Sequence, residues 1–138
     1  MSRIAFAAPI VLLLSACAVT PAAQSPVASA ASFADATPVE IKLTNFAFQP
    51  DDLQLRAGQA YAVSFTNEGF PHDWTAPEFF ANAQIAAADT GKVENGMVNV
   101  APGTTVVVHL VPAAGSYQII CAKPGHADRG MTGTISVS

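Results

Sequence analysis

The sequence predicts an all-β domain, a sandwich or barrel of short strands, over residues 38–138. In several short runs apolar and polar residues alternate, as they do in half-buried strands. Turn-forming residues separate these runs at intervals of roughly 8–12 residues, a spacing typical of sandwiches and barrels. The helix-breaking residues glycine and proline, with 9 and 10 copies, also recur along the chain.

The predicted strands follow one another with short connections. The early runs alternate in polarity, and the later ones are rich in β-branched residues and stop at turns such as Pro102-Gly103. One stretch departs from this pattern: Pro77 to Ala88 is rich in alanine and predicts a short helical excursion across one end. The predicted strands cover residues 39–43, 53–56, 61–65, 98–100, 104–111, 117–121 and 134–137.

The N-terminus has the features of an export signal. Arg3 supplies positive charge, and residues 4–16 are almost entirely apolar but fewer than the roughly 20 that span a bilayer. The run closes with Leu14-Ser15-Ala16-Cys17, which resembles the lipobox of bacterial lipoproteins. That resemblance implies cleavage before Cys17 and a diacylglyceryl group on its sulfur. An ordinary secretory signal, cut at a nearby small residue, is the alternative.

Residues 18–37 consist mainly of Ala, Ser, Pro and Thr without a sustained period, which predicts a flexible tether. The chain therefore divides into a signal peptide (1–16), a lipidated linker (17–37) and a folded domain (38–138). We expect a lipid-anchored protein on the periplasmic side of a bacterial envelope membrane. Ala18 stands where Gram-negative lipoproteins carry a retention aspartate, which slightly favours the outer membrane.

The charge pattern argues against nucleic acid as a partner. From Cys17 onward five basic residues face ten acidic ones, and no basic run or patch occurs in the sequence. We expect the protein to be a monomer.

Three soft or borderline donor side chains lie close together near the C-terminus. Cys121, His126 and Met131 have the spacing C-x4-H-x4-M, and His72 offers a fourth donor upstream, after a predicted strand. If Cys17 carries lipid, Cys121 has no partner for a disulfide within its own chain. A free thiol is a liability in an oxidising compartment, and a bound metal would occupy it.

A thiolate, two imidazoles and a weak thioether form the donor set of blue-copper centres. Thiolate and thioether suit Cu(I), whereas imidazole also serves Cu(II), so a rigid cage of this kind changes little when an electron moves. Structural zinc sites usually add another strong ligand, and catalytic ones need an open position for water. The pattern therefore favours copper over zinc.

At these residues the sequence resembles the cupredoxins, the family of plastocyanin, azurin and rusticyanin. The resemblance runs from Phe48-Gln49-Pro50 to the string Cys121-x-x-Pro-Gly-His126, followed by Gly130-Met131-x-Gly-Thr. It implies an eight-stranded Greek-key sandwich with one copper ion at one end. It also implies that the outer edge of one imidazole reaches the surface within an apolar patch. The implied ligands are His72, Cys121, His126 and Met131.

Around this site the resemblance suggests further roles. Many cupredoxins have Asn after the first histidine and Thr or Ser after the cysteine, and these side chains bridge the two ligand loops. Here Asp73 and Ala122 occupy the positions, so we expect the usual bridge not to form, and we hypothesise that an ionised Asp73 lowers the reduction potential. The residues expected around the ligands are Asp73, Ala122, Pro124 and Gly125. The residues of a possible docking patch are Phe70, Pro71, Pro124 and Ala127.

The leading functional hypothesis is a membrane-tethered type 1 copper protein that carries single electrons between redox partners, such as a cytochrome c or an oxidase domain. The alternative is a periplasmic protein that binds or delivers copper without carrying current. A sandwich that only contacts other proteins, without metal, is a third hypothesis. We do not expect an enzyme, because four protein donors leave copper little space for a substrate.

Overall fold

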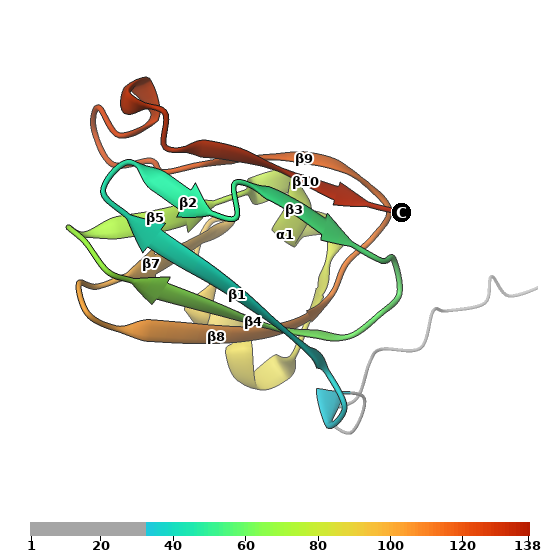
Figure 1. The fold of residues 1–138 in the computed structure, drawn as a ribbon. Coiled ribbons are helices and arrows are strands. Elements are labelled where there is room, and N and C mark those ends of the chain that lie inside the picture. Colours follow the sequence, from blue (N-terminus) through green and yellow to red (C-terminus); the bar gives the residue numbers. More distant parts are fainter. Residues whose placement is uncertain (1–32) are drawn as a thin grey trace, which may run out of the picture.

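Two five-stranded sheets face each other in the computed structural model, which describes residues 33–138 (Figure 1). The first sheet has the strand order β2-β1-β4-β8-β6, and the second has the order β3-β10-β9-β5-β7. In chain order the strands β1 to β10 are Thr37–Thr44, Ala47–Gln49, Asp52–Leu55, Tyr61–Asn67, His72–Thr75, Gln84–Ile85, Met97–Val100, Thr105–Val111, Gly115–Ile120 and Thr132–Val137. The helical turns are α1 (Pro77–Asn82), η2 (Ala87–Lys92) and η3 (Ala127–Arg129).

The predicted sandwich with a short helical excursion is confirmed, and each predicted strand is present with its ends within two residues. Three short strands, β2, β5 and β6, were not predicted. The Ala-rich stretch that begins at Pro77 is broken by β6 rather than forming one helix. His72, expected directly after a strand, is instead the first residue of β5. Strand β5 has no alternation to reveal it, because three of its four side chains are buried.

The core lies between the sheets and follows from the alternation of side chains. Strand β4 alternates buried and half-buried residues along its whole length, which places one face inward. Trp74 of β5 is fully buried and packs against the rings of Phe65, Phe79 and Phe80. Helix α1 begins with Pro77, and its two phenylalanines complete this cluster. Aromatic packing therefore fixes β5 against the core.

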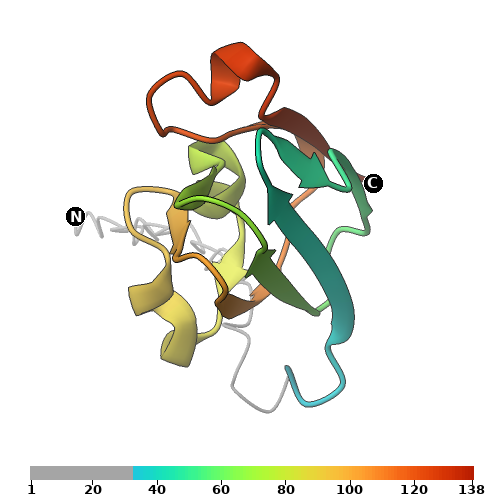
Figure 2. The ribbon, with the colours of Figure 1, turned by 60° about the vertical axis from the view of Figure 1, so that its left-hand side comes forward.

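Strands β10, β9 and β5 are neighbours in the second sheet, and β9 runs antiparallel to both of the others. The last residues of β9 therefore lie at the same end of the sheet as the first residues of β5 and β10. The long β9–β10 connection, which includes η3, projects from this end of the sandwich in both ribbon views (Figures 1 and 2). The topology thus brings three separate chain segments to one end of the sandwich.

The described chain enters the sandwich at the end opposite to the β9–β10 connection (Figure 1). Phe33, within the predicted linker, is buried and its ring contacts the ring of His109 edge-on. Thr37 already pairs with Tyr61, so regular structure begins one residue before the predicted domain boundary. The predicted signal peptide and the lipidation residue Cys17 lie outside the described residues. Among residues 33–138 no helix is long and apolar enough to cross a membrane.

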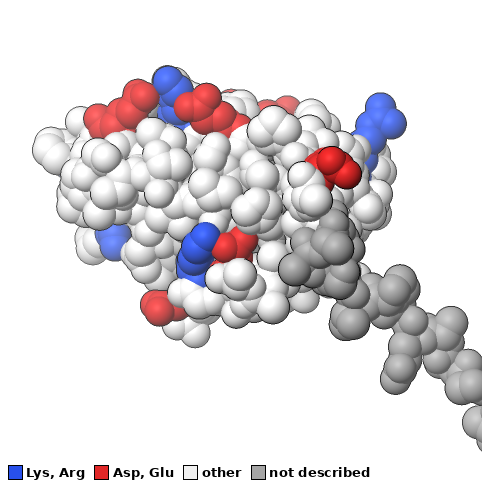
Figure 3. Space-filling view, turned by 90° about the horizontal axis from the view of Figure 1, so that it is seen from below, with Lys and Arg blue, Asp and Glu red and all other residues white. Residues whose placement is uncertain are grey.

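Charged side chains are sparse on the face seen from below. Figure 3 shows a mostly uncharged surface on which basic and acidic side chains lie scattered, some of them side by side. No extended basic patch is present on this face of the described domain, in agreement with the excess of acidic residues in the sequence.

Candidate metal centre

His72 is the first donor and is held by a strand. It begins β5, where it pairs with Val100 of β7, and only 1% of its surface is exposed. Burial lowers the pKa of His72 below its ordinary value, and the nearby His126 lowers the pKa further, against the opposing influence of Asp73. The imidazole is therefore neutral at pH 7 and has a lone pair available for a metal.

Cys121 is the second donor and follows the last residue of β9 directly. Its side chain is buried, and its backbone N–H donates a hydrogen bond to the carbonyl oxygen of Met131 at 3.0 Å. Burial raises the pKa of the Cys121 thiol above its ordinary value. Without a metal the sulfur is thus protonated at pH 7, and metal binding would displace this proton.

His126 is the third donor and lies in the β9–β10 loop just before η3. The turn that presents it is closed by a hydrogen bond from the His126 N–H to the carbonyl oxygen of Lys123. Gly125 in this turn has a φ of 75°, a left-handed conformation that glycine adopts without steric cost. His126 is half-buried, whereas His72 and Cys121 are buried, so it is the most exposed of the three donor residues.

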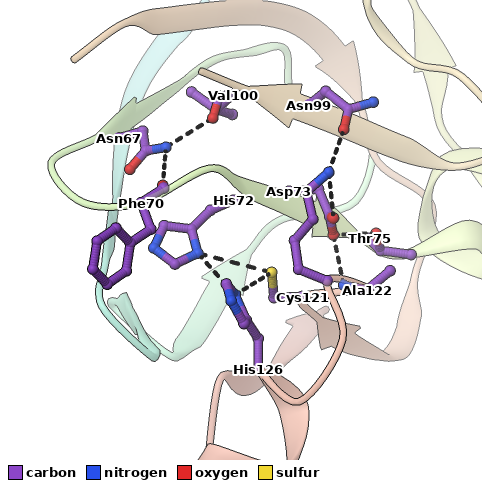
Figure 4. Close-up of polar contacts among 11 residues, drawn as sticks. Asn67, Phe70, His72, Asp73, Thr75, Asn99, Val100, Cys121, Ala122 and His126 are labelled. Carbon is purple, nitrogen blue, oxygen red and sulfur yellow. Dashed lines mark hydrogen bonds and ion pairs between the residues drawn. The ribbon is translucent and has the colours of Figure 1, made fainter. Parts of the chain in front are cut away.

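The three donor atoms converge on one point (Figure 4). The Nδ1 atoms of His72 and His126 are 3.2 Å apart, and the Cys121 Sγ lies 3.9 Å from the former and 3.4 Å from the latter. With bonds of roughly 2.0–2.3 Å, as zinc forms with the same donor types, a trigonal centre needs donor atoms about 3.5–3.8 Å apart. The observed triangle is within a few tenths of an ångström of that size and fits one metal ion.

Met131 lies directly before β10 and is fully buried. Its N–H donates to the carbonyl oxygen of His126 at 3.1 Å, and its carbonyl oxygen accepts the hydrogen bond from Cys121. The backbone of this residue is thus tied to two of the three converging donors. The structure brings Met131 to the same end of the sandwich as the donor triangle.

Asp73 bridges the two ligand segments in a form that differs from the usual side-chain bridge, which was not expected at these residues. Its Oδ1 accepts hydrogen bonds from the backbone N–H of Ala122 at 2.7 Å and from the Thr75 hydroxyl at 2.8 Å (Figure 4). The donor is the backbone N–H of the residue after Cys121, which is present whatever side chain that residue carries, so Ala122 can still form this bond. Asp73 is 1% exposed and performs the bridging itself.

Lys123 adds a positive charge beside this buried carboxylate. Its Nζ lies 3.6 Å from the Asp73 Oδ2 and donates a hydrogen bond to the Asn99 Oδ1 at 3.3 Å. A buried carboxylate needs a partner of opposite charge or several hydrogen bonds, and Asp73 has both. The ion pair therefore reduces the net negative charge next to the donor triangle.

Asn67 supports the segment that leads to His72, a role that was not predicted from the sequence. The buried side-chain amide donates to the carbonyl oxygens of Phe70 and Val100 at 2.7 and 2.8 Å, and its Oδ1 accepts from the Gly69 N–H at 2.8 Å (Figure 4). An Asn at a turn can bond its own backbone two residues on, which is the signal that the Asn-Glu-Gly sequence offered. The hydrogen bond from Asn67 to Val100 of β7 could not be predicted from the sequence.

The residues of the possible docking patch come from the two loops that flank the donors. Phe70 is 59% exposed, and Pro71 and Pro124 are exposed as well, whereas Ala127 is half-buried. Pro124 and Gly125, expected near the ligands, form the turn before His126. The apolar residues thus lie at the end of the sandwich where His126 reaches the surface.

Comparisons with known proteins agree with this geometry. The family described as copper binding proteins, plastocyanin/azurin family, matches residues 36–138. A search of curated proteins found no match.

Similar solved structures include three auracyanins. A dithionite-reduced auracyanin from the photosynthetic bacterium Roseiflexus castenholzii has 21% identity and a TM-score of 0.55, covering 75% of this chain and 98% of that one. Auracyanin B has 25% identity and a TM-score of 0.53, with 75% and 89% covered. Auracyanin A, a "blue" copper protein from Chloroflexus aurantiacus, has 22% identity and a TM-score of 0.53, with 74% and 98% covered. With the family match over residues 36–138, the chain belongs to the plastocyanin/azurin family of copper-binding proteins, and its cofactor is copper.

Proposed function

We propose that this protein is a type 1 copper protein that carries single electrons between redox partners. The observation that carries the proposal is the convergence of three donor atoms within 3.2–3.9 Å of one another, one thiol sulfur and two imidazole nitrogens. Copper held by such donors cycles between Cu(I) and Cu(II) and so supplies one electron at a time. His72, Cys121 and His126 are the strong ligands in this proposal, and the buried Met131 is the weak axial one.

The positions of the ligands support electron transfer. His72, Cys121 and Met131 are at most 1% exposed, so solvent reaches the proposed site mainly at His126. Strand pairing fixes His72, and the Asp73–Ala122 hydrogen bond ties its segment to that of Cys121. Ligands held in this way move little between oxidation states, which keeps the barrier to transfer small.

Electrons would enter and leave at the exposed edge of His126. Phe70, Pro71, Pro124 and Ala127 give this end an apolar surface on which a partner could approach closely. Partners of this kind are other redox proteins, such as a cytochrome c or an oxidase domain. The match of apolar surface and exposed ligand edge supports this part of the proposal.

The tether belongs to the same proposal. Lipid on Cys17 would anchor the protein to an envelope membrane on the periplasmic side, with the outer membrane slightly favoured by Ala18. The described chain enters the sandwich at the end away from the donor triangle, which would leave the His126 edge free of the anchor (Figure 1). Incorporation of labelled palmitate that Cys17→Ala abolishes would support the anchor, and equal labelling of both proteins would contradict it.

Absorption spectroscopy tests the proposed ligands. Protein loaded with Cu(II) should show an intense visible band from the thiolate–copper bond, and Cys121→Ser should abolish it. Met97→Leu is the matched control, because this methionine lies on β7 outside the proposed ligand set and its variant should keep the band. Loaded wild-type protein without colour would contradict the proposal.

Redox cycling separates electron transfer from copper delivery. An electron carrier should retain its copper through repeated oxidation and reduction in the presence of a Cu(I) chelator. Loss of the metal to the chelator within the first cycles would contradict the carrier and favour delivery.

A further inference from the structure

We propose that Phe46, in the β1–β2 turn, is a positioning residue that clamps the loop carrying His126 in its metal-binding arrangement before copper binds. The inference rests on the proposed role of His126 as a ligand. It adds a residue that neither the motif spacing nor the donor triangle includes.

The ring of Phe46 contacts two side chains of the β9–β10 loop. Its centroid is 5.1 Å from that of His126, and the two rings are nearly perpendicular, at 89°. On the same ring the Cζ of Arg129 lies 4.6 Å from the centroid, a distance at which a guanidinium is attracted to an aromatic face. His126 and Arg129 stand at the two ends of η3. One aromatic side chain therefore contacts both ends of this turn.

The backbone of Phe46 is strained. Its φ is 69°, in the left-handed region that a bulky side chain rarely adopts. Such a conformation persists where the surroundings determine it, and such residues cluster at functional sites. Glycine would adopt this φ more easily, so the contacts of the ring, which also packs against the hydrophobic core, maintain the strained conformation.

The preceding residue fastens the same turn to the other ligand segment. The Oδ1 of Asn45 accepts a hydrogen bond from the Phe70 N–H at 3.0 Å, in the loop that leads to His72. Gly69 allows this approach, because a Cβ at that position would lie 2.3 Å from the Asn45 Oδ1. The turn therefore contacts both loops, the first through Asn45 and the second through Phe46.

His126 needs such a support more than the other donors do. His72 is held by β5, and Cys121 directly follows β9, whereas His126 lies between strands. The backbone hydrogen bonds made by His126 go to Lys123, Arg129 and Met131, all within its own loop or at its end. The ring of Phe46 supplies a contact from the body of the sandwich, which would preorganise the ligand.

Hydrogen exchange in the copper-free full chain tests the clamp. Phe46→Ala should speed amide exchange over residues 122–130 by about tenfold. This factor corresponds to the combined interaction free energy of an aromatic pair and a cation–π contact. Phe70→Ala is the matched control: this phenylalanine is 59% exposed at the same end, and its loss should leave exchange in the loop unchanged.

Two further variants keep the result clear. Phe46→Gly removes the ring and relieves the backbone strain, so the turn should fold while loop exchange is still faster. Arg129→Gln removes only the cation and should speed exchange by roughly threefold. Copper release to a Cu(I) chelator should also be faster than in wild type, and more so in Phe46→Ala than in Arg129→Gln.

Wild-type exchange rates over residues 122–130 in both Phe46→Ala and Phe46→Gly would overturn the clamp. An equal acceleration in Phe70→Ala would overturn it too, because the effect would then be general to this end of the sandwich. The exchange experiment contains no copper. A failure of the proposed ligand set would therefore appear as missing colour, with the exchange result still readable.

Discussion

Asp73 accepts a hydrogen bond from the backbone N–H of Ala122 at 2.7 Å, and this bond joins the segment of His72 to that of Cys121. The carboxylate is buried, and the Nζ of Lys123 lies 3.6 Å from its second oxygen. An acidic side chain beside the proposed copper ligands thus has both a structural role and an electrostatic one.

The charge of Asp73 should lower the reduction potential, because negative charge near copper favours Cu(II). Asp73→Asn keeps an oxygen that can accept from Ala122 while it removes the charge. We expect the potential of this variant to rise by roughly tens of millivolts, as measured by redox titration of the copper protein. An unchanged or lower potential would refute the electrostatic role.

Lys123 should act in the opposite direction. Lys123→Met leaves the Asp73 carboxylate without its positive partner, so the potential should fall by roughly tens of millivolts. The Lys123 side chain is 36% exposed, so high salt should shrink the difference from wild type. Arg129→Met offers a comparison, since it removes a positive charge from the same loop but not the partner of Asp73. Equal shifts in the two variants would argue against the specific ion pair.

Asn67→Ala should destabilise the protein by about 1–3 kcal/mol, because it removes hydrogen bonds to three buried or partly buried backbone groups. The carbonyl oxygens of Phe70 and Val100 lose a donor, and the Gly69 N–H loses its acceptor. Urea unfolding of the copper-free protein measures the change. Asn82→Ala is the control: this Asn is exposed on α1, bonds only within its helix, and should alter stability little. Equal losses in the two variants would contradict a special role for Asn67.

Asp89 should contribute stability that is lost in acid. Burial raises the pKa of this carboxyl, but hydrogen bonds from Lys92 and His109 outweigh burial and lower the pKa to about 2. A carboxyl with a lowered pKa stabilises the folded state above the unfolded value of about 3.9, and this stabilisation disappears as the pH falls through 2. Lys92 and His109 are partly exposed, so screening limits the contribution to roughly 1–2 kcal/mol.

Asp89→Asn should therefore be less stable than wild type at pH 7, and the difference should vanish near pH 2. Thermal unfolding at a series of pH values checks this. Asp128→Asn, at an exposed position of η3, is the control for a general effect of charge. A difference between Asp89→Asn and wild type that stays constant down to pH 2 would be inconsistent with the lowered pKa.

Copper affinity should rise with pH. The pKa of the Cys121 thiol lies above its ordinary value of about 8.5, so metal binding at pH 7 releases a proton. The pKa of His72 lies below about 6.5, so this imidazole adds no competing proton between pH 7 and 8. We expect the affinity for Cu(I) to increase about tenfold between pH 7 and pH 8, as measured by competition with a chelator. The residual affinity of Cys121→Ser should not show this increase.

The individual donor residues differ in how well their place in the site could be predicted from the sequence. The spacing of Cys121, His126 and Met131 was informative because all three belong to one short loop between two strands, where local sequence determines separation. His72 lies in another segment, and the sequence offered it as a fourth donor only because it follows a predicted strand. The structure brings the donor atoms of His72, Cys121 and His126 together because β5 and β9 are antiparallel neighbours.

The sequence by itself determined the strand alternation of the sandwich and the donor types, because period and side-chain chemistry are local properties. Only the tertiary structure decided what surrounds the donors: the Asp73–Ala122 bridge, the Lys123 ion pair, the Asn67 network and the contact of Phe46 with His126. Each of these contacts joins residues far apart in the chain or depends on a backbone group with no side-chain signature. Their partners are fixed only when strands from both sheets meet at one end of the sandwich.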